Sequence, residues 1–164
     1  MMETRFRDSS VDSIKSDLLV LPVEEKKLEV PALRTLNRRL KGKLSEQIQK
    51  SKFTGGEGSS FSYSTAGILP ASHLLLVGLG KASDVDSDSW RKVGARARKE
   101  ASAVGAQDIA FFFAPEKDPD AAAGAVVEGA TLASYRFNKY RSNSGAPTVI
   151  KSLTLFKPGL KRTS

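Results

Sequence analysis

The sequence contains no cysteine, has one histidine, and is nowhere apolar for long. Without cysteine, the chain cannot form disulfides, thiolate metal sites or a cysteine nucleophile. His73 is the single histidine, and no neighbouring residue orients it as a general base. No run reaches the roughly 18 apolar residues that a membrane span needs, and no apolar stretch follows the first charges. We therefore expect a cytoplasmic protein with no membrane partner.

The composition of the chain is typical of one packed domain. Its 164 residues are enough to bury a single core, and 40% hydrophobic with 27% charged residues is not the composition of a disordered chain. We expect the domain to cover residues 1–157. Residues 158–164 are short and basic, as in a linker or the end of an expressed fragment.

Positive charge is concentrated in two blocks. The chain has 26 Lys and Arg residues against 18 Asp and Glu residues, a net charge of +8. Two groups of candidate nucleic-acid-binding residues lie within this excess: Arg34, Arg38, Arg39, Lys41 and Lys43, then Arg91, Lys92, Arg96 and Lys99, with Arg98 in the same run. Such blocks favour phosphate contact without base reading. A solvated face, or a surface paired with an acidic neighbouring domain, is the alternative.

Apolar runs and helical spacings alternate along the chain. Strands are expected at residues 16–23, 61–65, 71–80, 107–115 and 148–158, the second and third forming a hairpin or an adjacent pair. Helices are expected within residues 30–53, divided at Gly42, within 83–106 with Gly105 as a stop, and from Pro119 to residue 137. This alternation predicts an α/β sandwich with a mixed, mostly parallel sheet.

Two motifs could bind ligands. Gly78 and Gly80, in HLLLVGLGK, follow an apolar strand at a place where backbone N–H groups can bind phosphate. They lack the spacing of a P-loop and the third glycine of a dinucleotide fingerprint, so a structural turn or a vestigial ligand loop is the favoured interpretation. Three aspartates at 84, 86 and 88 have calcium-loop spacing without the closing glutamate, so helix capping explains them better.

The segments HLLLVGLGK, GAQDIAFFF and AAAGAVVEGATLASYRFNKYRS follow one another between residues 73 and 142. The last segment contains Glu128, Gly129 and Ala130 and then Y-R-F-x-x-Y, with Arg141 where lysine is common. In this order they resemble the amino-terminal domain of the leucyl aminopeptidase (cytosol aminopeptidase) family. The similarity runs from about Asp17 to Phe156.

This resemblance implies a macro-domain-like three-layer sandwich that belongs to a larger hydrolase. Members of the family are homohexameric exopeptidases that remove amino-terminal residues from peptides with two divalent metals, commonly zinc, manganese or magnesium. Their metal ligands and catalytic residues lie in a carboxy-terminal domain. The N-T-D-A-E-G-R metal motif is absent here, so we assign no catalytic residue, metal ligand or cofactor to this chain and expect it to be inactive alone.

The implied partners are the catalytic domain of the parent protein, further copies in an oligomer, and duplex DNA, which some members of the family bind. Two alternatives remain: a stand-alone nucleic-acid-binding module, and a macro domain that binds phosphate or ADP-ribose. One observation argues against a macro domain that binds phosphate or ADP-ribose. Ligand-binding macro domains have an asparagine-rich ribose loop at the place where this chain has Leu21, Pro22 and Val23. Asp17 could still match the acid that opens the strand.

Overall fold

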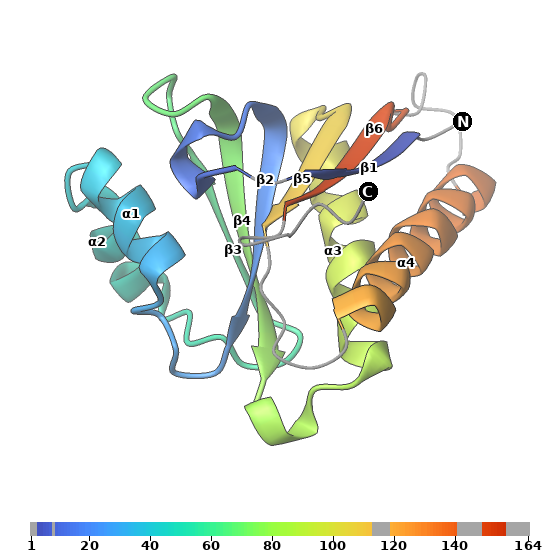
Figure 1. The fold of residues 1–164 in the computed structure, drawn as a ribbon, viewed down its shortest axis with the longest axis horizontal. Coiled ribbons are helices and arrows are strands. Elements are labelled where there is room, and N and C mark those ends of the chain that lie inside the picture. The colour runs from blue at the N-terminus through green and yellow to red at the C-terminus, as the bar shows by residue number, and fades with distance from the viewer. Residues whose placement is uncertain (1–2, 8, 113–118, 141–148, 157–164) are drawn as a thin grey trace.

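The computed structural model describes residues 3–7, 9–112, 119–140 and 149–156, which form a six-stranded sheet between two layers of helices (Figure 1). The strand order is β1-β6-β5-β2-β4-β3, and all neighbours are parallel except β3 and β4. The strands are β1 (Glu3–Arg7), β2 (Ser16–Glu24), β3 (Ser60–Ser64), β4 (Ala71–Gly80), β5 (Asp108–Phe112) and β6 (Ser152–Phe156). The mixed, mostly parallel sheet is confirmed. The tail at 158–164 lies outside the described residues.

Strand β1 is absent from the elements that the sequence predicts. Its residues, ETRFR, alternate charge with other side-chain types and contain no apolar run. Among the described strands it lies at the edge of the sheet and pairs with β6 alone, from Glu3 opposite Ser152 to Arg7 opposite Phe156. Edge strands often carry charge, which discourages pairing with other chains. The pairing partner lies almost a whole chain length away, so local pattern cannot reveal this strand.

The helices cover the two faces of the sheet in pairs, α1 with α2 and α3 with α4 (Figure 1). They are α1 (Pro31–Arg39), α2 (Lys43–Ser51), α3 (Ser87–Val104) and α4 (Pro119–Tyr140), with short 3₁₀ turns at Val11–Ser13 and Ala82–Asp84. Gly42 separates α1 from α2 with a φ of 81°, and Gly105 ends α3 with a φ of 73°. Both predicted breaks are confirmed, because glycine adopts this left-handed conformation without strain.

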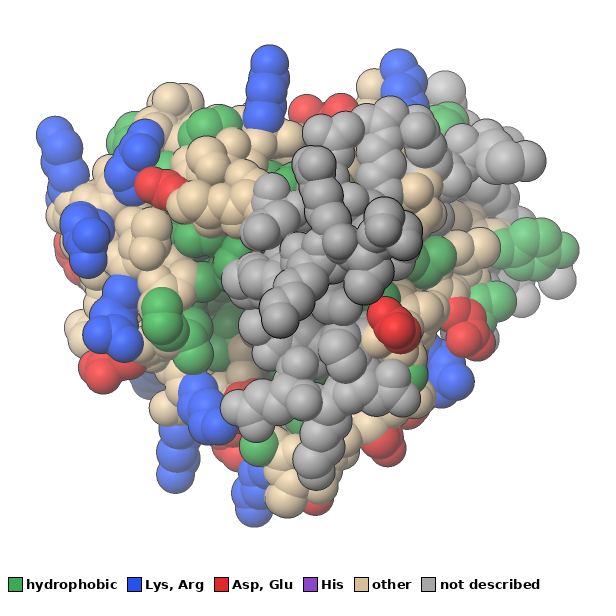
Figure 2. Space-filling view, in the orientation of Figure 1, with side chains coloured by type: hydrophobic (Ala, Val, Ile, Leu, Met, Phe, Trp, Pro, Cys, Tyr) green, Lys and Arg blue, Asp and Glu red, His purple; other side chains and the backbone are tan. Residues whose placement is uncertain are grey.

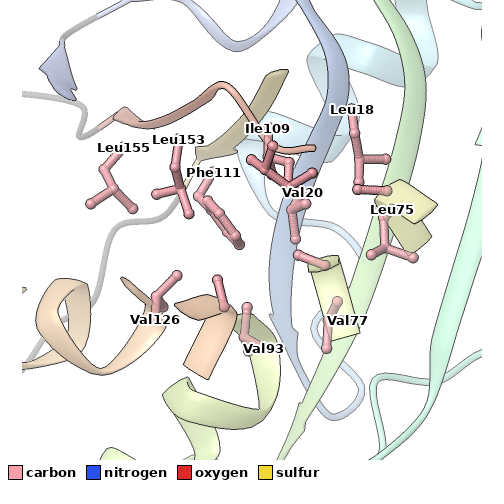
Figure 3. Packing of buried hydrophobic residues seen from close by; sticks show 14 of the residues in the cluster. Leu18, Val20, Leu75, Val77, Val93, Ile109, Phe111, Val126, Leu153 and Leu155 are labelled. Atoms are coloured by element: carbon pink, nitrogen blue, oxygen red, sulfur yellow. The ribbon is translucent and has the colours of Figure 1, made fainter. Parts of the chain in front are cut away.

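Alternate residues of the central strands enter two separate cores. Leu18 and Val20 of β2 pack toward α3 and α4, in the core that Figure 3 shows with Val93 and Val126. Leu19 of β2 packs in the opposite core with the apolar residues of α1 and α2. A strand whose two faces are both covered is apolar at successive positions, as β2 is from Leu18 to Val23. Each buried Val or Leu contributes about 1.5–3 kcal/mol of burial free energy.

Helices α3 and α4 approach each other at two glycines. A Cβ on Gly94 of α3 would lie 2.0 Å from the carbonyl oxygen of Val126, and one on Gly129 of α4 would lie 2.0 Å from that of Arg91. Beside this contact, Arg91 Nε and Glu128 Oε1 are 3.4 Å apart. The Glu128–Gly129–Ala130 motif therefore has a structural role: its glycine admits the backbone of α3, and its glutamate pairs across the helices.

Arg98 also lies between these two helices, with 3% of its surface exposed. Its Nε donates to Ser134 Oγ at 2.7 Å, and Nη1 donates to Ser102 Oγ. A buried guanidinium is tolerated only when it is hydrogen-bonded, and these hydroxyls help to meet that need. Arg98 therefore contributes no charge to the surface, unlike the other members of its sequence block.

Candidate functional site

The glycines of HLLLVGLGK lie at the end of β4, against the loop of residues 54–59. Gly78 N–H donates to the Ser59 carbonyl at 2.8 Å, and Gly80 N–H donates to the Gly55 carbonyl at 3.0 Å. A Cβ on Gly78 would lie 2.0 Å from the carbonyl oxygen of Gly56. Because both amides already bond to carbonyls of this chain, they are not free to bind a phosphate.

The two glycines have different structural roles. Gly80 has a φ of 78° and begins the change of direction that the sequence predicts. The 3₁₀ turn Ala82–Asp84 then separates β4 from α3. Gly78 lies inside the strand and lacks a side chain because the loop backbone packs directly on it. This arrangement favours the structural interpretation of the motif over a phosphate cradle.

The backbone N–H groups that follow the neighbouring end of β2 also donate to carbonyls of this chain. Glu25 N–H donates to the Gly80 carbonyl at 2.9 Å, and Lys26 N–H donates to the Thr54 carbonyl at 2.8 Å. Asp17, at the other end of β2, accepts from the N–H groups of Gln107 at 2.9 Å and Asp108 at 3.1 Å. Asp17 thus ties β2 to the start of β5 instead of facing a ligand.

The nine candidate basic residues do not form one surface. The five from residues 34–43 belong to α1, α2 and the turn between them, on one side of the sheet, and the four from residues 91–99 belong to α3, on the other side. Figure 2 shows Lys and Arg side chains projecting on the side of the molecule where Figure 1 places α1 and α2. The two sequence blocks therefore need separate functional explanations.

The α1–α2 basic face, defined by Arg34, Arg38, Lys41 and Lys43, is exposed throughout. Arg39 is partly neutralised, since its Nη1 lies 3.3 Å from Asp12 Oδ2. The hydrogen bond from Ser10 lowers the pKa of Asp12, and Arg39 adds to that effect. None of the four residues that define the face has an ion-pair partner within the described part of the chain.

On the other side of the sheet, a cleft lies between the loop of residues 57–58 and α3, over the end of β4. Its volume is about 290 Å³. Lys92, Arg96 and Lys99 line it together, because their spacing of four and three residues places them on one face of α3. The remaining lining residues are Glu57, Gly58, Val77, Gly78, Leu79, Ser89 and Ala95. Sequence reasoning singled out Gly78 as a turn or vestigial ligand-loop residue and missed the others, because they come from a loop, a strand and a helix that meet only in the fold.

Hydrogen bonds from two of the basic residues tie α3 to the loop. Lys92 Nζ donates to Glu57 Oε1 at 2.8 Å and lies 3.3 Å from Asp88 Oδ2. The bonds to Glu57 and then Asp88 raise the pKa of Lys92 above its ordinary value. Arg96 Nη2 donates to the Gly58 carbonyl at 2.8 Å. Lys99 has no ion-pair partner among the residues that the structure describes.

Of the three aspartates that the sequence assigns to helix capping, Asp86 is the N-cap of α3, and Asp88 lies in its first turn. Asp86 accepts from Ser89 N–H at 3.0 Å, while Ser89 Oγ accepts from Asp86 N–H at 3.1 Å, which completes a capping box. The bond from the Ser89 backbone lowers the pKa of Asp86.

In the described ranges no group of three or more His, Asp or Glu side chains could hold a metal ion, so these residues do not fit a two-metal centre. No described helix is both long and apolar enough to cross a membrane.

Comparison with known proteins identifies the domain. The profile of the cytosol aminopeptidase family, N-terminal domain, matches residues 20–144. A probable cytosol aminopeptidase of Alkaliphilus oremlandii is 31% identical over 153 residues, which cover 88% of this chain and 30% of the relative. A probable cytosol aminopeptidase of Syntrophotalea carbinolica is 30% identical, over 87% of this chain and 30% of its own length. The chain thus spans about a third of the curated relatives it matches.

Solved structures agree with this result. A mutant of tomato leucine aminopeptidase superposes with a TM-score of 0.81 and 26% identity, over 95% of this chain and 32% of that one. A Trypanosoma brucei macrodomain in complex with ADP superposes with a TM-score of 0.67, over 93% of this chain and 63% of that one. Its 13% identity shows the fold alone, and the expected macro-domain-like fold is confirmed. The chain belongs to the cytosol aminopeptidase family and corresponds to its N-terminal domain.

Proposed function

We propose that this chain is the non-catalytic domain of a metal-dependent aminopeptidase that removes amino-terminal residues from peptides. The observation that carries the proposal is the family match over residues 20–144, in a chain that spans 30% of its aminopeptidase relatives. The two divalent metals, zinc, manganese or magnesium, would be held by the catalytic domain of the whole protein. The name of these relatives supports a cytoplasmic location.

The domain's role in this proposal is to support assembly and substrate access. The outer surface of α4 supports the assembly role, because Leu132 and Tyr135 are 50% and 70% exposed there. The exposed positions of this helix also include Asp120, Ala121, Gly124 and Thr131, and its exposed Glu128 pairs with Arg91. Large exposed apolar side chains are typical of protein contacts. The proposed partners are the catalytic domain and further copies of the subunit.

Release of leucine from leucyl amide tests the catalytic part of this proposal. With added Mn²⁺, the purified 164-residue chain is expected to show no turnover, because the groups that would hold the metals lie outside it. The Alkaliphilus oremlandii relative serves as the positive control under the same conditions. Turnover by the 164-residue chain that is abolished by a chelator would contradict the proposal.

We propose DNA contact as a second function, and the α1–α2 basic face favours it. Arg34, Arg38, Lys41 and Lys43 are exposed together, with no ion-pair partner among the described residues. Four phosphate contacts predict that log K falls with log salt concentration with a slope of about −4. A slope near zero, or no binding at low salt, would exclude this function.

A matched pair of charge reversals locates the DNA contact. Arg34→Glu with Arg38→Glu is expected to abolish binding to labelled duplex DNA, because the two side chains lie one turn apart on α1. Arg96→Glu with Lys99→Glu changes the net charge equally on the opposite side of the sheet and should retain most of the affinity. Equal losses in the two variants would mean that net charge, and not this face, drives the binding.

A further inference from the structure

The cleft beside α3 presents three kinds of surface within one small volume. Val77 and Leu79 of β4 and Ala95 of α3 are its apolar lining. Arg96 and Lys99 bring positive charge from α3, and Glu57 brings a carboxylate from the loop. A volume of about 290 Å³ lies just below the range of small-molecule sites, about 300–1,000 Å³. The cleft therefore suits a compact ligand with an apolar group and both charges.

The charged groups of the cleft retain unused bonding capacity. The structure gives Arg96 one hydrogen bond, from Nη2 to Gly58, and a guanidinium has five N–H donors. Lys99 is exposed and lacks an ion-pair partner within the described residues. Glu57 accepts from Lys92 on Oε1, and its side chain is 55% exposed. Two cations and one carboxylate are thus accessible to a ligand without loss of the bonds between loop and helix.

We propose that this cleft binds a free α-amino acid with an apolar side chain. Such a molecule has the complementary set of groups: a carboxylate for Arg96 and Lys99, an ammonium for Glu57, and a side chain for the apolar lining. Leucine is chosen as the probe because of the proposed function, since an aminopeptidase releases free amino acids.

Titration of the ¹⁵N-labelled 164-residue chain with L-leucine tests the proposal. Saturable shift changes are expected at Gly58, Gly78 and Ala95, which line the cleft. Three probes each lack one group: 4-methylpentanoate lacks the ammonium, isoamylamine lacks the carboxylate, and glycine lacks the side chain. Each should bind about tenfold more weakly than leucine or worse. Equal binding of any of them, or shift changes outside the cleft, would overturn the proposal.

Neutral substitutions on α3 complete the test. Arg96→Gln and Lys99→Gln should each weaken leucine binding by about tenfold, whereas Lys50→Gln, on α2 across the sheet, should leave it unchanged. Amide spectra and melting temperatures of all variants monitor the fold. Unchanged affinity in both α3 variants would overturn the proposal. Because binding to the isolated chain is the readout, the result does not depend on whether the whole protein is an aminopeptidase.

Discussion

Replacement of Gly129 by alanine is expected to destabilise the domain by about 2 kcal/mol or more. The added Cβ would lie 2.0 Å from the carbonyl oxygen of Arg91 and 2.8 Å from its Cα, so α3 and α4 must move apart. Both contact atoms belong to the backbone, and no rotamer change can relieve the clash. Urea or thermal unfolding measures the loss, and each kcal/mol corresponds to about 2–4 °C in Tm for a domain of this size.

Gly124→Ala on the same helix is the matched control, with the opposite expected sign. Gly124 is exposed, and a Cβ there would meet no atom of the described residues within 4 Å. Alanine is therefore expected to stabilise α4 by about 0.5–1 kcal/mol through its higher helix propensity. If Gly129→Ala also stabilised the domain, the close contact between α3 and α4 would be wrong.

Replacement of Gly78 by alanine is expected to cost about 1–3 kcal/mol and to release the loop of residues 54–59. The new Cβ would lie 2.0 Å from the Gly56 carbonyl oxygen and 2.7 Å from the Gly55 carbonyl carbon. The loop must withdraw, which breaks the bonds from Gly78 to Ser59 and from Gly80 to Gly55. Faster hydrogen exchange of these two amides, with a lower Tm, is the expected readout.

Gly56→Ala tests the same contact from the other side. A Cβ on Gly56 would meet nothing closer than Thr54 Oγ1 at 3.9 Å among the described atoms, and its φ is not in the left-handed range. This variant should keep near-normal stability and slow exchange at the two β4 amides. Equal protection of those amides in the Gly56 and Gly78 variants would contradict the close approach of the loop to β4.

Local pattern predicts much of the fold because burial and backbone conformation leave direct marks in the sequence. The apolar run of β2 reflects two covered faces, and Gly42 and Gly105 mark left-handed positions where helices begin or end. The capping role of Asp86 follows from its place just before a helical apolar pattern. Each of these signals comes from residues that are close together in the chain.

Features that depend on distant contacts leave no such mark. The need for glycine at 78 comes from a loop about twenty residues earlier, and the need at 129 comes from another helix. Arg98 has the same charge as its neighbours Arg96 and Lys99, yet it is buried because its side of α3 meets α4. The cleft has the same origin, since only the tertiary fold brings Glu57 beside Lys92.

The candidate site also combines a feature that local pattern predicts with one that depends on distant contacts. The sequence correctly indicates that Lys92, Arg96 and Lys99 share one face of a helix, because helical periodicity alone determines that. It cannot indicate that α1 and α3 lie on opposite sides of a sheet, since that depends on the topology of the crossovers. The basic blocks therefore look like one surface in the sequence and occupy two in the structure.

The most direct test of the central claim, that this chain serves as the scaffold domain of an aminopeptidase, is the activity of a chimera. In it, the 164-residue chain replaces the matching segment of the Alkaliphilus oremlandii relative. The chimera is expected to release leucine from leucyl amide with added Mn²⁺ and to assemble to the same oligomeric state as the relative. A chimera that folds and binds metal yet neither assembles nor turns over would contradict the claim.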